Sequence, residues 1–182
     1  GSAAEVRAVA ARVDLRAGPL TGAKASEGAV KRSAPGRRLI HLATHGFFAG
    51  GKLRSALART GGARSADELA GYHPLLLSGV VLAGANAAES GPGGEDGVLT
   101  AEELAGLDLG AAELVVLSGC DTGLGEVVDG EGVLGLSRAL AAAGARQVVV
   151  SLWKVPDRET GALMASFYRY LTSDRGMDVL RS

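Results

Sequence analysis

Short runs of aliphatic residues alternate along this chain with segments in which apolar residues recur every three or four positions. The runs are typical of strands buried on both faces, and the periodic segments are typical of helices that cover a sheet. Strands are predicted over Arg38–Thr44, Leu75–Leu82, 114–120 and Gln147–Trp153. Helices are predicted over Ala3–Val13, 26–33, a stretch that starts at Thr100, Val133–Ala143 and Asp157–Leu171. This order predicts an α/β fold with a mostly parallel central sheet and helices on both faces.

Three segments lack this patterning. Residues Phe47–Gly71 are rich in Gly, Ala, Ser and Arg, and we interpret them as a long loop with at most one helical turn. The glycine-rich segments Gly84–Gly97 and Asp121–Gly132 are expected to be loops, the first of them mobile. Thr100, followed three residues later by Glu103, is a capping-box pattern that predicts where a helix begins.

Composition and charge narrow the class of protein. The 182 residues suit one domain with a sizeable core, and the net charge of −1 gives no basic footprint for nucleic acid. No apolar run approaches the length of about 20 residues needed to span a bilayer. A chain with one cysteine has no internal disulfide, which favours a reducing compartment or a thiol kept for reactivity.

That one cysteine, Cys120, ends an apolar run in the same way that His45 ends another. Each run is expected to be a buried strand that delivers a reactive side chain to a glycine-containing turn. Parallel strands open their ligand sites at their carboxyl ends, so the two side chains are expected to meet there. A thiol with a neighbouring imidazole is the smallest set of side chains that a catalytic cysteine nucleophile needs.

The blocks around these residues resemble the CHAT domain, a branch of the caspase-like cysteine peptidases related to separase. Five blocks carry the resemblance, in the expected order and spacing, together with Asp157. They are His41-Leu-Ala-Thr-His45-Gly46, Gly97-Val-Leu-Thr-Ala-Glu-Glu103, Leu117-Ser-Gly-Cys120-Asp-Thr-Gly123, Gly130-Glu-Gly-Val-Leu-Gly-Leu-Ser-Arg138 and Gly144-Ala-Arg-Gln-Val-Val-Val-Ser-Leu-Trp153. The resemblance covers the chain from about Leu20 onward.

The resemblance implies a cysteine endopeptidase in which Cys120 is the nucleophile and His45 the catalytic base. A neighbouring imidazole lowers a thiol pKa toward the reactive thiolate, and it then protonates the leaving amine. The backbone N–H groups of Gly46 and Cys120 are the expected oxyanion-hole donors. The reaction is expected to need no metal and no organic cofactor.

Four further residues are candidates for the substrate pocket: Asp121, Trp153, Asp157 and Glu159. In separases, acids equivalent to the 155–161 segment line a pocket for a basic residue. Helix capping explains Asp157 equally well, and core packing is the alternative for Trp153. His41 is either a partner of the site or a satisfied buried histidine, and His73 is expected in a loop.

The implied architecture is a caspase-like three-layer sandwich in a single domain over residues 1–182. We expect this domain to be a fragment of a longer multidomain protein and to be short at both ends. The expected partners are a protein substrate and the regulatory or repeat domains of a cytoplasmic, bacterial parent protein, with no nucleic acid and no membrane. Loops 84–97 and 121–132 are hypothesised to assemble the site on activation. The alternatives are a non-catalytic CHAT interaction module and a flavodoxin-like small-molecule-binding domain in which Cys120 is incidental.

Overall fold

A parallel three-stranded sheet lies at the centre of the molecule. The computed structural model describes residues 2–13, 18–48, 53–55, 69–72, 74–87, 94–118, 131–151 and 157–173. The strands of the central sheet, in spatial order, are β1 (Leu39–Ala43), β7 (Leu114–Ser118) and β8 (Val148–Val150). Both neighbouring pairs are parallel, as the continuous apolar runs predict.

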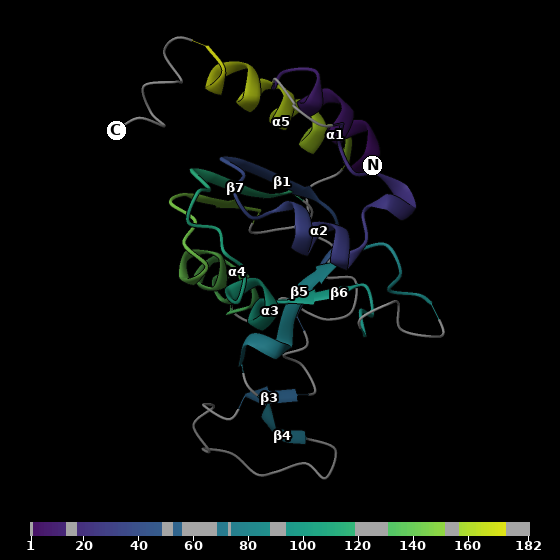
Figure 1. Ribbon diagram of the computed structural model, residues 1–182, viewed down its shortest axis with the longest axis vertical. Coiled ribbons are helices and arrows are strands. Elements are labelled where there is room, and N and C mark those ends of the chain that lie inside the picture. The colour runs from purple at the N-terminus through teal and green to yellow at the C-terminus, as the bar shows by residue number, and fades with distance from the viewer. Residues whose placement is uncertain are drawn as a thin grey trace.

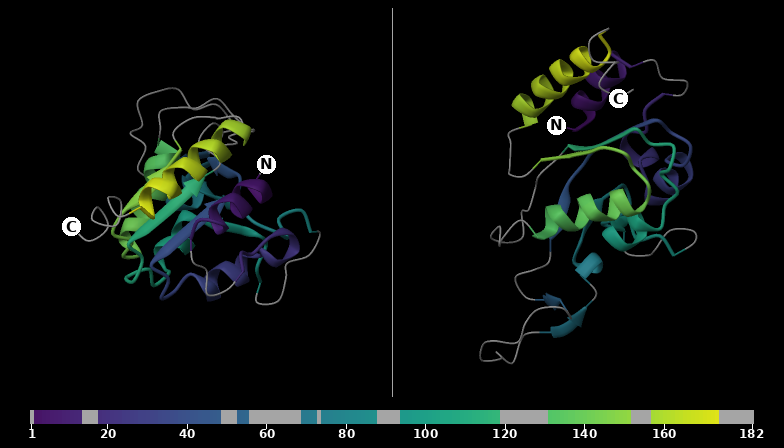
Figure 2. Two further views of the ribbon diagram at one scale, coloured as in Figure 1. Left: turned by 90° about the horizontal axis from the view of Figure 1, so that it is seen from above. Right: turned by 90° about the vertical axis from the view of Figure 1, so that its left-hand side faces the viewer.

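Helices cover both faces of this sheet (Figure 1). Helices α1 (Ser2–Ala10) and α5 (Asp157–Leu171) pack together on one face, where Leu114 and Val116 meet Val9 and Tyr168. Helices α2 (Glu27–Ser33), α3 (Ala101–Ala105) and α4 (Glu131–Ala142) lie on the other side of the sheet (Figure 2). The mixed α/β class and the parallel sheet between helices are therefore confirmed for the described residues.

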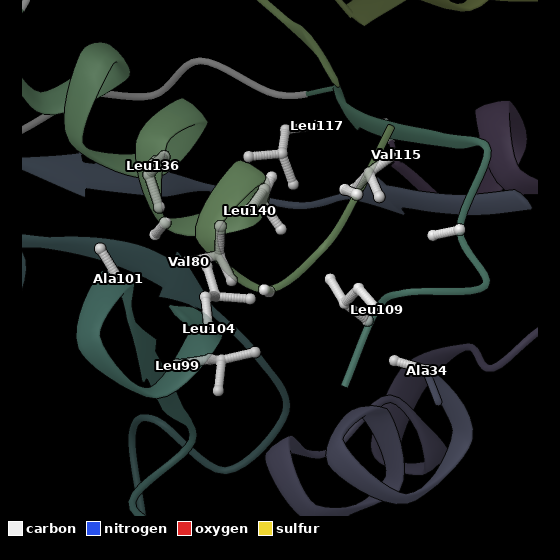
Figure 3. Close-up of a cluster of buried hydrophobic side chains, with 14 of the residues drawn as sticks. Ala34, Val80, Leu99, Ala101, Leu104, Leu109, Val115, Leu117, Leu136 and Leu140 are labelled. Carbon is white, nitrogen blue, oxygen red and sulfur yellow. The ribbon is translucent and has the colours of Figure 1, made fainter. Parts of the chain in front are cut away.

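The larger core lies between the sheet and helices α3 and α4. Alternation along β7 divides its side chains, because Val115 and Leu117 enter this core while Leu114 and Val116 face α1 and α5. Figure 3 shows Val115 and Leu117 of β7 in one cluster with Leu136 and Leu140 of α4 and Leu104 of α3. All five residues of β7 are buried, so this strand is held rigidly between the two helical layers.

A second, antiparallel sheet was not predicted. It consists of β2 (Gly46–Phe48), β5 (Ser78–Val81) and β6 (Val98–Thr100), in that order. The predicted strand at Leu75–Leu82 is therefore shorter than expected, begins after the 3-10 turn at Pro74–Leu77, and is antiparallel to its neighbours. The expected loop over Phe47–Gly71 is also wrong in part, since β3 (Leu53–Ser55) and β4 (Leu69–Tyr72) pair within it, far from α1 and α5 (Figure 1).

The local end signals of the helices behave as the sequence predicts. The Ser26 side chain accepts a hydrogen bond from the backbone of Ala29 at the start of α2, and Thr100 and Glu103 form a complete capping box on α3. Gly144 ends α4 with a φ of 101°, a conformation in which glycine is favoured. These capping signals act within a few residues, and tertiary packing leaves the helix ends where the sequence predicts them.

A buried carboxylate ties α2 to the turn before β6. Glu27 is 2% exposed, and its Oε2 accepts a hydrogen bond of 3.0 Å from the backbone N–H of Gly97. Lys31 donates to Glu27 and, at 2.8 Å, to Glu103 of α3. Glu95 accepts from the Gly28 backbone at 2.9 Å, so both ends of the turn are bound to α2. The end of the predicted mobile loop 84–97 is thus fixed, and residues 88–93 lie outside the described part.

The same network shifts two pKa values. Hydrogen bonds to Glu103 and Glu27 raise the pKa of Lys31. Burial acts to raise the pKa of Glu103, but hydrogen bonds from Lys31 and Thr100 outweigh it, so that this pKa lies below its ordinary value. A carboxyl whose pKa is lower in the folded state stabilises the fold above its unfolded pKa, and this contribution is lost as the pH falls through the folded value.

We therefore expect Lys31→Met to destabilise the fold at pH 7 and to matter less in acid. The loss at pH 7 should be about 1–2 kcal/mol, a moderate value because Lys31 and Glu103 are partly solvated. Urea unfolding of both proteins should show the difference shrinking as the pH falls below about 4, where free carboxyls become protonated. Lys24→Met, at an exposed lysine, is the control and should change stability by less than about 0.5 kcal/mol. A loss that stays constant with pH would contradict this assignment.

Candidate functional site

The site is built on the carboxyl ends of β1 and β7, which are adjacent and parallel. Ala43 and Ser118 are the last paired residues of the two strands, and the N–H of Thr44 donates to the carbonyl of Ser118 at 3.0 Å. His45 follows Ala43 by two positions, and Cys120 follows Ser118 by two positions. The prediction that the two strands deliver their residues at one edge of one sheet is confirmed as far as Ser118.

Cys120 itself lies in the 119–130 stretch, outside the described residues, as does Asp121. Trp153 and His73 are also outside them. Asp157 is the first residue of α5, and Glu159 is exposed in the first turn of that helix. The described residues therefore fix the strands that lead to the predicted dyad, while the four pocket residues stay predictions.

The second sheet holds His45 in place at the end of β1. The carbonyl of His45 accepts a hydrogen bond of 2.7 Å from the N–H of Val81, and the Thr44 hydroxyl donates to the carbonyl of Val81. The side chain of His45 is exposed to solvent. The backbone of His45 is therefore anchored by β5 while its side chain lies at the protein surface.

The N–H of Gly46 points away from its paired strand. Gly46 lies opposite Val80, while the bond from Val81 to His45 makes the preceding pair the hydrogen-bonded one. In an antiparallel ladder the next pair is then non-hydrogen-bonded, with its N–H groups turned outward. Because β2 is an edge strand among the described strands, this N–H faces away from the sheet. A Cβ at Gly46 would meet only the Gly79 carbonyl, at 3.6 Å, so the packing of the protein does not itself require glycine here.

Gly79, in contrast, is needed to seat β2. A Cβ at this position would lie 2.7 Å from the Phe47 ring and 2.7 Å from the carbonyl of Leu99. The Phe47 ring thus covers the glycine directly across the ladder. This contact brings β2, and with it Gly46, close against β5.

His41 is a satisfied buried histidine, which resolves one of the open alternatives. Its Nδ1 lies 3.0 Å from Tyr168 Oη, and its Nε2 lies 3.1 Å from Glu5 Oε1. The imidazole also meets the Tyr168 ring edge-on. Burial, with the Glu5 charge as a smaller cause, raises the pKa of Tyr168. This network ties β1 to α1 and α5 on the face away from the larger core.

Glu5 and Ser118 were missed by sequence reasoning. Glu5 lies four positions before Val9, on the apolar face of α1, and an acid at that position is a signal that it has a buried partner. Ser118 is 2% exposed and its hydroxyl has no hydrogen-bond partner. No sequence signal distinguishes it from a solvated strand-end serine.

No group of three or more His, Cys, Asp or Glu side chains suited to a metal ion occurs within the described ranges. In the same ranges, every helix is too short or too polar to cross a bilayer.

Comparison with known families agrees with the geometry of β1 and β7. The model of the CHAT domain matches residues 1–180. The chain belongs to the CHAT domain family. This family is caspase-like, so the match supports the α/β class and a peptidase-related site over the flavodoxin-like alternative. Neither a curated protein nor a solved structure matches the chain.

Proposed function

We propose that this CHAT domain is a cysteine endopeptidase with Cys120 as nucleophile and His45 as general base. The observation that carries the proposal is the register of β1 and β7. The last residue pair of these parallel strands is Ala43 with Ser118, and in the sequence His45 and Cys120 each follow this pair by two positions. In a caspase-like family, this is where a thiol and an imidazole can share a substrate.

The chemistry follows from the residue types. His45 takes the proton of the Cys120 thiol, and the thiolate attacks the scissile carbonyl carbon. The negative charge that develops on the carbonyl oxygen is stabilised by the outward N–H of Gly46 and by that of Cys120. His45 then protonates the leaving amine, and water hydrolyses the acyl-enzyme to restore the thiol.

The substrate is proposed to be an exposed, extended segment of a protein. The absence of a Cβ at Gly46 is not required by neighbouring groups, so close approach of a substrate backbone is a good reason for glycine there. Asp121, Trp153, Asp157 and Glu159 are proposed to shape the pocket and to favour a basic residue. Regulatory or repeat domains of the parent protein are the proposed partners that control the site.

Covalent labelling tests the dyad. The purified chain would be treated with a panel of peptide acyloxymethyl ketones, beside Cys120→Ala and His45→Ala, and read out by intact mass. One adduct that requires both residues is the expected result, and the sequence of the reactive peptide gives the specificity. Labelling that survives in His45→Ala would contradict the dyad. Absence of labelling, repeated on the full-length parent protein, would favour the non-catalytic interaction module.

A further inference from the structure

Thr44 and His45 form the junction between the parallel sheet and the antiparallel sheet. They lie between Ala43, the last residue of β1, and Gly46, the first residue of β2. Strand β1 pairs with β7, the middle strand of the first sheet, and β2 pairs with β5, the middle strand of the second. The course of the chain through this junction therefore sets where His45 and Gly46 lie relative to the end of β7.

Hydrogen bonds to β7 and to β5 hold the backbone of this junction. The N–H of Thr44 donates to the carbonyl of Ser118 at 3.0 Å, and the carbonyl of His45 accepts from the N–H of Val81 at 2.7 Å. The hydroxyl of Thr44 donates to the carbonyl of Val81. The backbone of Val81 thus binds both junction residues, while Thr44 by itself links β7 to β5.

Among these hydrogen bonds, only the one from the Thr44 hydroxyl comes from a side chain. It is therefore the bond that depends on the residue type at this position. A threonine hydroxyl has one proton to donate, and the carbonyl of Val81 receives it. The branched Cβ of threonine also restricts its χ1 rotamers, so that this bond costs less side-chain entropy than a bond from a freely rotating hydroxyl. The hydroxyl acts on the backbone of a neighbouring strand rather than on a substrate.

Strand β5 is a firm support for this bond. Its first three residues are buried, and Val80 packs in the larger core. At the other end of the junction, the Phe47 ring covers Gly79 of the same strand. The segment between Thr44 and Phe47 is thus held against β5 at both ends, by a hydroxyl at one end and by an aromatic ring at the other.

We propose that Thr44 is a positioning residue for His45 and Gly46, and that its hydroxyl acts through the bond to Val81. This inference rests on the proposed function, in which His45 is the general base and Gly46 is a donor to the oxyanion. The bond fixes the junction on β5, so the two groups keep a set position relative to the end of β7. Catalytic groups must be held within about 0.5 Å of their productive geometry, and a misplacement of about 1 Å can lower a rate by about 100-fold.

Two substitutions at position 44 separate the hydroxyl from the shape of the side chain. Thr44→Val removes the hydroxyl and keeps the branched Cβ, whereas Thr44→Ser keeps the hydroxyl. Thr172→Val is the matched control, because the Thr172 hydroxyl also donates to a backbone carbonyl, that of Tyr168, at 2.8 Å at the end of α5. For each variant, hydrolysis of a coumarin amide of the peptide selected in the labelling panel gives kcat and KM, and thermal unfolding gives Tm.

A second measurement follows His45 without any need for turnover. The chain has three histidines, His41, His45 and His73, so protein labelled isotopically at histidine gives three ring Cε1–H signals by nuclear magnetic resonance. The variants His45→Ala and His73→Ala assign these signals. His41 lies on β1 within its buried network, so an unchanged His41 signal shows that the fold of a variant is intact.

Thr44→Val is expected to shift or broaden the His45 signal and to leave the His41 signal unchanged. Its kcat and its kcat/KM should fall by the same factor, about 10- to 100-fold, because the positioned groups act in the transition state. Thr44→Ser should stay within about 3-fold of wild type, since it keeps the donor. Thr172→Val should match wild type in both measurements. If Thr44→Val does not fold, Thr44→Ala at a lower temperature takes its place.

The outcomes separate this inference from the proposed function. If His45→Ala is inactive but a folded Thr44→Val keeps the wild-type kcat and His45 signal, the role of Thr44 is refuted and the general base stands. An equal loss in Thr44→Ser would assign the effect to packing, and an equal loss in Thr172→Val would make it general, and the inference fails in both cases. If His45→Ala keeps the wild-type kcat, the proposed function is itself refuted, and the catalytic role of Thr44 with it.

Discussion

His45→Ala is expected to lose almost all peptide hydrolysis and to keep its fold. His41→Ala is expected to lose stability and to keep its hydrolysis rate while it is folded. The two histidines lie four positions apart on one chain segment and differ in their surroundings. His45 is exposed, so its loss should lower stability far less than the loss of His41, whose side chain is buried. Loss of a general base should lower kcat/KM by about 10²- to 10⁴-fold.

His41→Ala removes the imidazole contact of two buried groups, the Glu5 carboxylate and the Tyr168 hydroxyl. Removing one member of such a buried, partly charged network is expected to cost about 3 kcal/mol or more. At temperatures where it is still folded, this variant should hydrolyse substrate at a rate close to that of wild type, because His41 turns toward α1 and α5.

Both variants would be measured by thermal unfolding and by hydrolysis of a coumarin amide of the peptide selected in the labelling panel. His41→Ala with intact stability would show that the buried network contributes little. A folded His45→Ala that retains full activity would refute the assignment of His45 as base.

Gly97→Ala is expected to cause the largest loss of stability among alanine substitutions at the glycines that the structure describes, about 3 kcal/mol or more. Gly97 has a φ of 78°, and a Cβ there would lie 2.2 Å from the backbone nitrogen of Ala85. The clash is with backbone, so no side chain can move to relieve it. A shift of Gly97 would also strain its hydrogen bonds with Glu27 and with the N–H of Leu82.

Gly94→Ala is the matched control for this substitution. Gly94 belongs to the same turn and has a φ of 81°, but its Cβ would point into open space. Gly94→Ala should therefore lower the free energy of unfolding by only about 1 kcal/mol, the cost of placing alanine in a left-handed backbone conformation. Chemical denaturation of both variants measures the difference, which isolates the steric contribution at Gly97. If the two variants lose the same free energy of unfolding, the turn can rearrange to admit the Cβ at position 97, and the contact with Ala85 is unimportant.

The elements that sequence reasoning predicted well are those whose signals are local. The continuous apolar runs at Leu39–Ala43 and Leu114–Ser118 indicated two buried parallel strands. Both are found side by side, but only β7 is buried throughout, while the residues of β1 are half-buried. Thr100 and Glu103, which are three residues apart, indicated the start of a helix, and they form a complete capping box there. The predicted dyad followed from the same two runs, because parallel strands end at one edge.

The antiparallel sheet could not be predicted in this way. Its strand β6 has three residues and begins directly after Gly97, so its pattern is too short to show a period of two. Its strand β2 pairs with β5 because the Phe47 ring packs on Gly79, a contact between residues far apart in the chain. Only this pairing anchors the carbonyl of His45 and turns the Gly46 N–H outward.

By itself, the sequence determined the α/β class, the strands that end near His45 and Cys120, and the helix ends, because hydrophobic runs and caps act within a few residues. The tertiary structure decided the partners of His41, the burial of Ser118 without a partner, and the network of Glu27 and Lys31. These depend on which distant elements are packed together, and packing is set by the whole core rather than by any one segment.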